Sequence, residues 1–259
     1  ATASTTVLSD PAYRDGHGER MFINEIGASW QMVPSRLGAS FFSSDVVVFG
    51  GTALVPGLHD HLTGLLERSK NAGAVTVVNT VYDFRSELQR PGRRWRLGET
   101  DRSYSFIDLL ITDAEEALRL SGGSTLAEAS DWFIGKGVSS FAITNGTGHT
   151  WCFSDDRVFR ALPLGTLPVS DDLLTDLRRS DRGDTTGCGD NFVGGMIASL
   201  AWQMMAGKTP DLREAIAWGT VSGGYCCFHV GGTLLEKARG EKLEGILPYY
   251  EKYRRQVDG

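Results

Sequence analysis

The sequence is poor in cysteine, in proline and in long apolar runs, and each shortage excludes a class of protein. Its 259 residues include eight prolines and four cysteines, Cys152, Cys188, Cys226 and Cys227. So few cysteines do not form a disulfide-stapled scaffold, and we expect a reducing, cytoplasmic compartment. The most apolar stretch, residues 46–58, is short and is interrupted by glycines and a proline. We therefore expect no membrane span.

Positive charge is also scarce. Lysine and arginine number 26 against 32 aspartates and glutamates, which gives a formal net charge of −6. An acidic surface does not suit a phosphate backbone, so nucleic acid is not expected as a partner. Hydrophobic residues make up 41% and charged residues 22% of the chain. This composition is typical of globular proteins and excludes disordered and fibrous classes.

Strand-like and helix-like segments alternate through the middle of the chain. Continuous apolar runs predict strands at residues 45–49, 74–78, 108–112 and 140–144. Helical periodicity or capping signals follow them at residues 58–73, 113–120 and 125–136. Further strands are expected at 150–153 and 157–162, and further helices at 190–206, 211–229 and 241–255. The alternation predicts an α/β fold, a mostly parallel sheet with helices on both faces.

Two segments depart from this alternation. Residues 5–8 and 19–23 resemble the arms of a β-hairpin, with a polar turn at residues 15–18 between them. The charged stretch 170–183 is interpreted as a solvated loop rather than a basic lip near phosphates. The pair His59 and His61 has metal-ligand residue types, but without further ligands nearby we expect both at the surface.

The most informative segment is Asp184-Thr-Thr-Gly-Cys-Gly-Asp-Asn-Phe-Val-Gly-Gly195. Gly187 and Gly189 allow the backbone to turn sharply and approach a ligand. The apolar helix that follows would present free N–H groups at its N-terminus, which favours an anion. Asp190 stands at that terminus, where a carboxylate can accept a proton from a hydroxyl that attacks a phosphate. The alternative is that Asp190 is only a helix cap and that the glycines form only a tight turn.

This segment resembles the signature D-T-T-G-A-G-D-x-F-x-G-G of the ribokinase-like (PfkB) carbohydrate kinase family, with Cys188 in place of alanine. The resemblance implies that Asp190 is the catalytic base and that backbone N–H groups of Gly187, Cys188, Gly189 and Asp190 hold the transferring phosphoryl group. It also suggests a monovalent cation such as K⁺ near Asp184 and Thr186. The Cys188 thiol is either reactive at the helix N-terminus or a buried, inert side chain.

Other segments resemble the family in the same order along the chain. Gly27 and Ala28 resemble its substrate-facing segment, and residues 79–85 resemble its D-x-N-x-R loop, with Asn79 in place of the aspartate and Arg85 retained. The resemblance therefore assigns Asn79 and Arg85 to the acceptor.

Three further segments are similar to nucleotide and metal motifs of the family. Residues 113–116 resemble its N-x-x-E motif, in which Glu116 would hold Mg²⁺ through water while Asp113 replaces the asparagine; the alternative is an acidic first helical turn. Thr144 and Gly146 resemble the turn at the nucleotide phosphates. The loop from His229 to Gly232 resembles the one around the adenine.

The resemblance implies an ATP-dependent kinase that phosphorylates a hydroxyl of a sugar or sugar-like molecule. Residues 34–259 would form the α/β core and residues 1–33 a small β lid, through which a homodimer is expected. The family's N-terminal strand and Gly-Gly signature have no counterpart in this sequence, so it is a part of a longer chain, begins late, or belongs to a degenerate member. Two alternatives stay open: a pseudokinase that only binds a nucleotide or sugar, and an acceptor that is a nucleoside or a vitamin alcohol.

Overall fold

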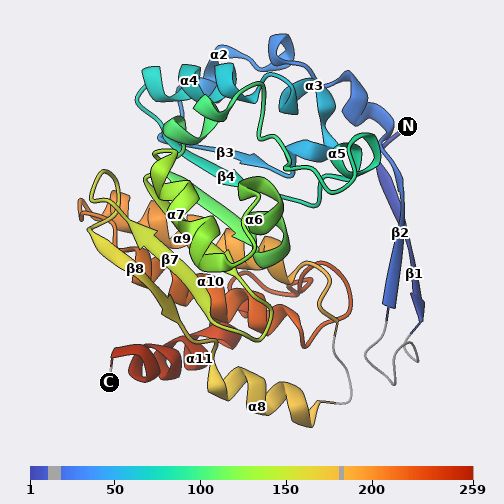
Figure 1. The fold of residues 1–259 in the computed structure, drawn as a ribbon. Helices are drawn as coiled ribbons and strands as arrows, with labels where there is room; N and C mark the ends of the chain where they lie inside the picture. The colour runs from blue at the N-terminus through green and yellow to red at the C-terminus, as the bar shows by residue number, and fades with distance from the viewer. Residues whose placement is uncertain (11–18, 181–183, 259) are drawn as a thin grey trace.

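The computed structural model describes residues 1–10, 19–180 and 184–258 (Figure 1). Its main sheet has six strands in the order β3-β4-β5-β6-β7-β8. These strands are β3 (Val46–Gly50), β4 (Val75–Asn79), β5 (Leu109–Asp113), β6 (Ser140–Thr144), β7 (Thr150–Ser154) and β8 (Leu162–Leu167). β3 to β6 are parallel, whereas β7 and β8 pair antiparallel. The predicted mostly parallel α/β fold is confirmed.

Helices cover both faces of this sheet. One face carries α4 (Leu62–Asn71), α6 (Ala114–Ser121) and α7 (Leu126–Gly135), and the other carries α9 (Cys188–Met205) and α10 (Leu212–Cys226). Successive strand side chains point to opposite faces. Val78 therefore packs with Leu66 and Phe133 on the first face, while its neighbour Val77 packs on the second. Burial on both faces explains why these strands are continuous apolar runs.

The other helices are short or lie at the edges of the sheet. They are α2 (Ala39–Phe42), α3 (Pro56–His59), α5 (Phe84–Gln89), α8 (Asp171–Arg179) and α11 (Glu241–Asp258). The described residues also include the 3₁₀ helices Gly27–Gln31, Pro34–Arg36, Thr52–Leu54 and Asp101–Phe106. No helix in the described part of the chain is long and apolar enough to cross a bilayer.

The expected loop at 170–183 is wrong for the part that the structure describes, because residues 171–179 form α8. The Ser170 hydroxyl caps this helix by accepting the Leu173 N–H at 3.4 Å. Leu173 is buried, while Asp172 and Asp176 bind Lys252 and Tyr249 of α11 at 2.6 and 2.9 Å. The charges that suggested a solvated loop therefore belong to one face of an amphipathic helix.

The expected strand at 157–162 is also misplaced. Asp156 adopts a left-handed conformation with φ 76°, and its carboxylate accepts the Ala161 N–H at 3.0 Å. The chain turns over these residues, and β8 begins only at Leu162.

The predicted hairpin is present as a separate two-stranded sheet. β1 (Ser4–Asp10) pairs antiparallel with β2 (Glu19–Glu25) and extends along one side of the core (Figure 1). It exposes apolar side chains, including Leu8, Met21 and Ile23, with more than half of each surface accessible. The predicted turn at residues 15–18 lies outside the described residues. That this hairpin acts as a lid stays a prediction.

Candidate active site

A cavity of about 140 Å³ lies where the parallel strands end. Parallel strands bring their carboxyl ends to one edge of a sheet, which is where α/β proteins bind ligands. Asp113 at the end of β5 is paired in register with Thr144 at the end of β6, and Asn79 ends β4. We call this space the strand-end cavity. It is lined by Asn79, Thr80, Ile111, Thr112, Asp113, Glu116, Thr144, Gly187, Gly189, Asp190, Phe192 and Val193.

The glycine turn forms one wall of the strand-end cavity. Gly187 caps α9 with φ 77°, a left-handed conformation that glycine adopts without strain. The first N–H within the helical ladder of α9 is that of Asn191, which donates to Gly187 at 2.9 Å. The Cys188 N–H is used inside the turn, where it donates to the Thr185 carbonyl at 3.2 Å. Among the described hydrogen bonds, the amides of Gly187, Gly189 and Asp190 have no partner, so they are the donors that this helix terminus would offer to an anion.

The opposite wall carries two carboxylates. The Asp113 side chain accepts the Glu116 N–H at 2.8 Å and caps α6. This is the arrangement that the alternative of an acidic first helical turn predicts. The Glu116 carboxylate accepts from the Thr80 hydroxyl and from the Thr112 hydroxyl, the latter at 3.4 Å. Burial, and then the charge of Asp113, raises the pKa of Glu116 to about 7. A cation between these oxygens would relieve that repulsion, so both residues fit a hydrated Mg²⁺.

A larger, mostly apolar cavity of about 370 Å³ adjoins the first. We call it the apolar cavity. The two share the lining residues Asp113, Thr144, Gly189 and Phe192, so they are neighbours on the same side of the molecule. The predicted Gly146 lines the apolar cavity, and the floor comes from α8 and α10. Its remaining lining residues are Thr147, Thr150, Val169, Ser170, Leu173, Leu174, Leu177, Thr185, Cys188, Thr220, Gly223, Gly224 and Cys227.

The sequence analysis did not predict that α8 contributes to the apolar cavity. Leu173, Leu174 and Leu177 recur at helical spacing inside the charged stretch, directly after the capping residue Ser170. That spacing and cap were the signal from which a helix could have been predicted.

The predicted residues around 184 and 232 support the turn rather than line either cavity. One Asp184 oxygen accepts the Thr186 N–H at 2.9 Å and the other accepts the Gly231 N–H at 3.3 Å. The Gly232 carbonyl accepts from the Asn191 amide at 2.8 Å. The His229 ring packs at 5.2 Å from Tyr225. The roles of Asp184 and Thr186 toward a cation, and of His229 and Gly232 toward adenine, stay predictions.

Of the predicted acceptor residues, the structure brings Asn79 to the strand-end cavity. Arg85 instead lies on α5, where both of its terminal nitrogens donate to the Asp60 carboxylate, one of them at 2.9 Å. Gly27 and Ala28 lie beside the N-terminus, and the Ala28 N–H donates to the Ala1 carbonyl at 2.8 Å. Arg85, Gly27 and Ala28 are not among the residues that line the two cavities.

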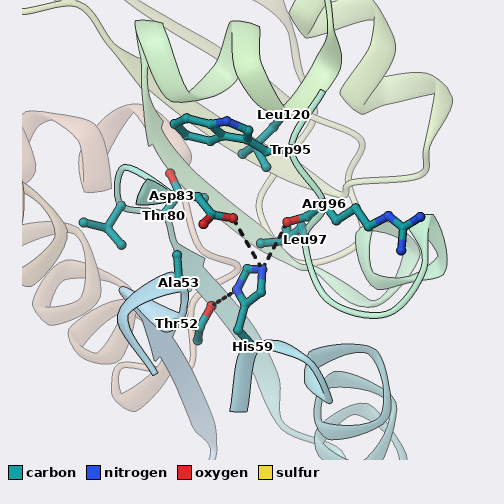
Figure 2. Close-up of a pocket in the computed structure, with 10 residues that line it drawn as sticks. Thr52, Ala53, His59, Thr80, Asp83, Trp95, Arg96, Leu97 and Leu120 are labelled. Carbon is teal, nitrogen blue, oxygen red and sulfur yellow. Dashed lines mark hydrogen bonds and ion pairs between the residues drawn. The ribbon is translucent and has the colours of Figure 1, made fainter. Parts of the chain in front are cut away.

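His59 is buried, and its expected surface position is wrong (Figure 2). Its two ring nitrogens lie 3.1 Å from the Thr52 hydroxyl and 3.1 Å from the Arg96 carbonyl. The Asp83 carboxylate lies 4.0 Å away and is also buried. Burial lowers the pKa of His59, against the opposing effect of Asp83. The small pocket around His59 is a neighbour of the strand-end cavity, because Thr80 lines both.

Cys188 is half-buried, so its exposure lies between the two alternatives, and whether the thiol is reactive or inert stays a prediction. Its Sγ lies 3.1 Å from Sγ of Cys227, which follows the end of α10. The contact between the two thiols lowers the pKa of Cys227 to about 7 and raises the pKa of Cys188.

The fold and the site together define an α/β protein with a mostly parallel sheet, in which a glycine turn at a helix N-terminus lies between a carboxylate pair and an apolar cavity. Residues 12–238 match the model of the pfkB family of carbohydrate kinases. The chain belongs to this family, and the resemblance of the glycine turn is confirmed.

Individual relatives are more distant. The chain is 24% identical over 186 residues to a fructokinase from Vibrio alginolyticus, over 70% of this chain and 53% of that protein. It therefore spans about half the length of this curated relative.

Solved structures of other proteins share the fold. The aminoimidazole riboside kinase of Salmonella enterica, complexed with aminoimidazole riboside and an ATP analogue, aligns with TM-score 0.60 and 18% identity, covering 88% of this chain and 70% of that one. A candidate ribokinase II from E. coli in complex with ATP and Mg²⁺ aligns with TM-score 0.64 and 16% identity, covering 92% and 68%.

Proposed function

We propose that this chain transfers the terminal phosphoryl group of ATP to a hydroxyl of a sugar or sugar-like small molecule. The observation that carries the proposal is the set of residues that line the strand-end cavity. It places the Asp190 carboxylate, the free amides of Gly187 and Gly189 and the Asp113–Glu116 pair around one space, next to an apolar cavity. Membership of the pfkB family and the kinases among its structural relatives support the same reaction.

Asp190 is the proposed general base. It is exposed in the first turn of α9 and lines the strand-end cavity, so an acceptor hydroxyl can reach its carboxylate. The carboxylate would take the hydroxyl proton as the oxygen attacks phosphorus. Charge that develops on the phosphoryl oxygens would be stabilised by the amides of the turn and by the positive end of the α9 dipole.

Asp113 and Glu116 are the residues that would hold Mg²⁺, through water at Glu116. When bound, Mg²⁺ neutralises negative charge on the nucleotide phosphates. Burial and the neighbouring carboxylate raise the pKa of Glu116 to about 7, so a bound cation would favour its ionised form at neutral pH. K⁺ near Asp184 and Thr186 remains a proposal that rests on the family resemblance.

The apolar cavity is the proposed site of the nucleotide base. Its volume of about 370 Å³ and its wall of α8 leucines suit a flat heterocycle, which gains most from apolar contact. Thr144 lines both cavities and Gly146 the apolar one, which supports their expected position beside the nucleotide phosphates.

The acceptor would enter from the strand-end side, where Asn79 supplies an amide. A sugar and a nucleoside would both present hydroxyls there; a fructokinase is similar to the chain in sequence and a riboside kinase in fold. We propose that the exposed apolar face of the β1–β2 hairpin closes over the acceptor or pairs with a second copy. A monomeric mass by light scattering at working concentration would remove the homodimer.

The test is acceptor-dependent release of ADP from Mg-ATP, with K⁺ present, across a panel of sugars, sugar acids, nucleosides and vitamin alcohols. Asp190→Asn keeps the shape of the side chain and removes the base, so we expect activity to fall by about 10²–10⁴-fold. The matched control is Asp211→Asn. Asp211 caps the N-terminus of α10 and lines neither cavity. Full activity in Asp190→Asn would refute the assignment of the base.

A second outcome would favour the pseudokinase. If neither this chain nor a longer form turns over any acceptor, while ATP still raises the melting temperature, the protein binds without catalysis. Saturation at about 100 times Kd would stabilise the folded chain by roughly 2.7 kcal/mol.

A further inference from the structure

Two cysteines far apart in the sequence meet beside the glycine turn. Cys188 is the first residue of α9 and Cys227 follows the last residue of α10, and their Sγ atoms lie 3.1 Å apart. Helices α9 and α10 pack closely at this point, because a Cβ on Gly223 of α10 would lie 2.9 Å from the Cys188 carbonyl. The pair is thus held together by the helix packing and not by flexible loops.

Both thiols are reachable from the apolar cavity, since both residues line it and neither is fully buried. The other two cysteines differ. Cys152 is buried in the core between the sheet and α9. Cys226 is buried, and its Sγ lies 3.2 Å from the Asn191 amide and 3.6 Å from the Gly232 carbonyl. Among the four cysteines, a small oxidant in the apolar cavity therefore meets Cys188 and Cys227 first.

We propose that Cys188 and Cys227 form an oxidative modification site, at which hydrogen peroxide converts the two thiols into a disulfide that disables the glycine turn. One sulfur attacks a peroxide oxygen, which breaks the O–O bond, forms a sulfenic acid and releases water. The second sulfur then attacks the sulfenic sulfur, and the S–O bond breaks with release of a second water. In total, two thiols and one H₂O₂ give one disulfide and two H₂O.

The bond has a geometric consequence for the turn. A disulfide has an S–S length of about 2.05 Å, so the two sulfurs must approach by about 1 Å from their present separation. Cys188 lies between Gly187 and Gly189, whose amides line the strand-end cavity. Rotation of the two side chains takes up part of this approach, and we expect the rest to shift the backbone of Cys188 and with it the proposed anion-binding donors, where a misplacement of about 1 Å can cost roughly 10²-fold in rate.

The consequence for activity rests on the proposed function. We expect oxidation to lower phosphoryl transfer at least tenfold and dithiothreitol to restore it. Because both thiols line the cavity proposed for the nucleotide base, ATP bound there should slow disulfide formation. Disulfide formation and its slowing by ATP are both measured as changes in the protein's mass, so neither measurement requires catalytic activity.

The experiment treats the reduced protein with a stoichiometric amount of hydrogen peroxide, with and without ATP. Intact-mass spectrometry follows the loss of two hydrogens, and ADP release is measured before and after reduction. Cys227→Ser is compared with its neighbour Cys226→Ser, and each variant is compared with its own reduced form. We expect the mass loss in the wild type and in Cys226→Ser, and its absence in Cys227→Ser.

Three results would overturn the proposal. These are no mass loss in the wild type, an equal mass loss in Cys227→Ser, and a disulfide that leaves the activity of an active protein unchanged. A chain that phosphorylates no acceptor but still forms the disulfide, more slowly with ATP, would separate failure of the proposed catalysis from failure of this site.

Discussion

Replacing Gly187 by alanine tests whether the glycine turn is held by close packing. Gly187 has φ 77°, and an added Cβ would lie 2.1 Å from the carbonyl oxygen of Gly232. Gly189, two residues later, has no atom within 4 Å of the corresponding position. The same methyl group is therefore placed in a crowded site in one variant and in open space in the other.

The expected cost follows from these two contacts. A left-handed backbone costs an L-residue about 1–2 kcal/mol. Overpacking against a neighbour that cannot rotate away adds about 1–3 kcal/mol. We expect Gly187→Ala to lower the free energy of unfolding by about 3 kcal/mol. For a chain of this size that corresponds to a melting temperature roughly 6–12 °C lower.

Gly189→Ala is the matched control. Alanine is favoured over glycine inside a helix by about 1 kcal/mol, so its melting temperature should stay the same or rise slightly. Differential scanning calorimetry or urea unfolding of the two variants beside the wild type makes the comparison. Equal stabilities for Gly187→Ala and Gly189→Ala would refute the contact between the turn and the loop at Gly232.

Two further predictions concern the surroundings of the site. Burial lowers the pKa of His59 from its ordinary value of 6.5, so below pH 6.5 the unfolded chain binds more protons and stability falls, by at most about 1.4 kcal/mol per pH unit. In urea unfolding at pH 7.5 and 5.5, His59→Gln should lose less stability on acidification than the wild type; an equal loss would contradict the buried neutral ring. Leu173 is 2% exposed on the wall of the apolar cavity, so Leu173→Ala should lower stability by about 2–5 kcal/mol and weaken ATP binding in calorimetry. Leu88→Ala, at an 83% exposed position, is the control, and a similar ATP affinity in both variants would contradict the base site.

The parts of the fold that the sequence predicts well depend on local signals. The parallel strands are continuous apolar runs because both of their faces are buried. Asp113 and Thr125 precede helices α6 and α7, and their side chains accept the N–H groups of Glu116 and Glu128 as caps. The glycine turn was located from one contiguous segment, since its conformation depends on residues that are adjacent in the chain.

Several of the misplaced parts involve contacts between distant residues. α8 was taken for a loop although its leucine spacing and Ser170 cap are local signals; only the partners of its acidic side chains, on α11 about 80 residues away, lie beyond the reach of such signals. His59 is buried because Arg96 and Asp83, on later segments, close around it. Arg85 has the residue type of an acceptor ligand, yet Asp60 binds it. No periodicity in one sequence reports such pairings.

The family signature combines two physical tasks in twelve residues. Gly187, Gly189 and Asp190 line the strand-end cavity, where their amides and carboxylate would face the proposed ligand. Gly195 lines neither the strand-end cavity nor the apolar cavity. A Cβ there would lie 2.5 Å from the Trp218 carbonyl, so its lack of a side chain lets α9 lie against α10. Asn191 joins the two tasks by bonding the carbonyls of Gly187 and Gly232 at 2.7 and 2.8 Å. Because α10 ends at Cys226, beside Cys227, the close helix packing that positions the turn also brings Cys227 to Cys188. The chemistry proposed for the turn and its proposed sensitivity to oxidation therefore have the same structural cause.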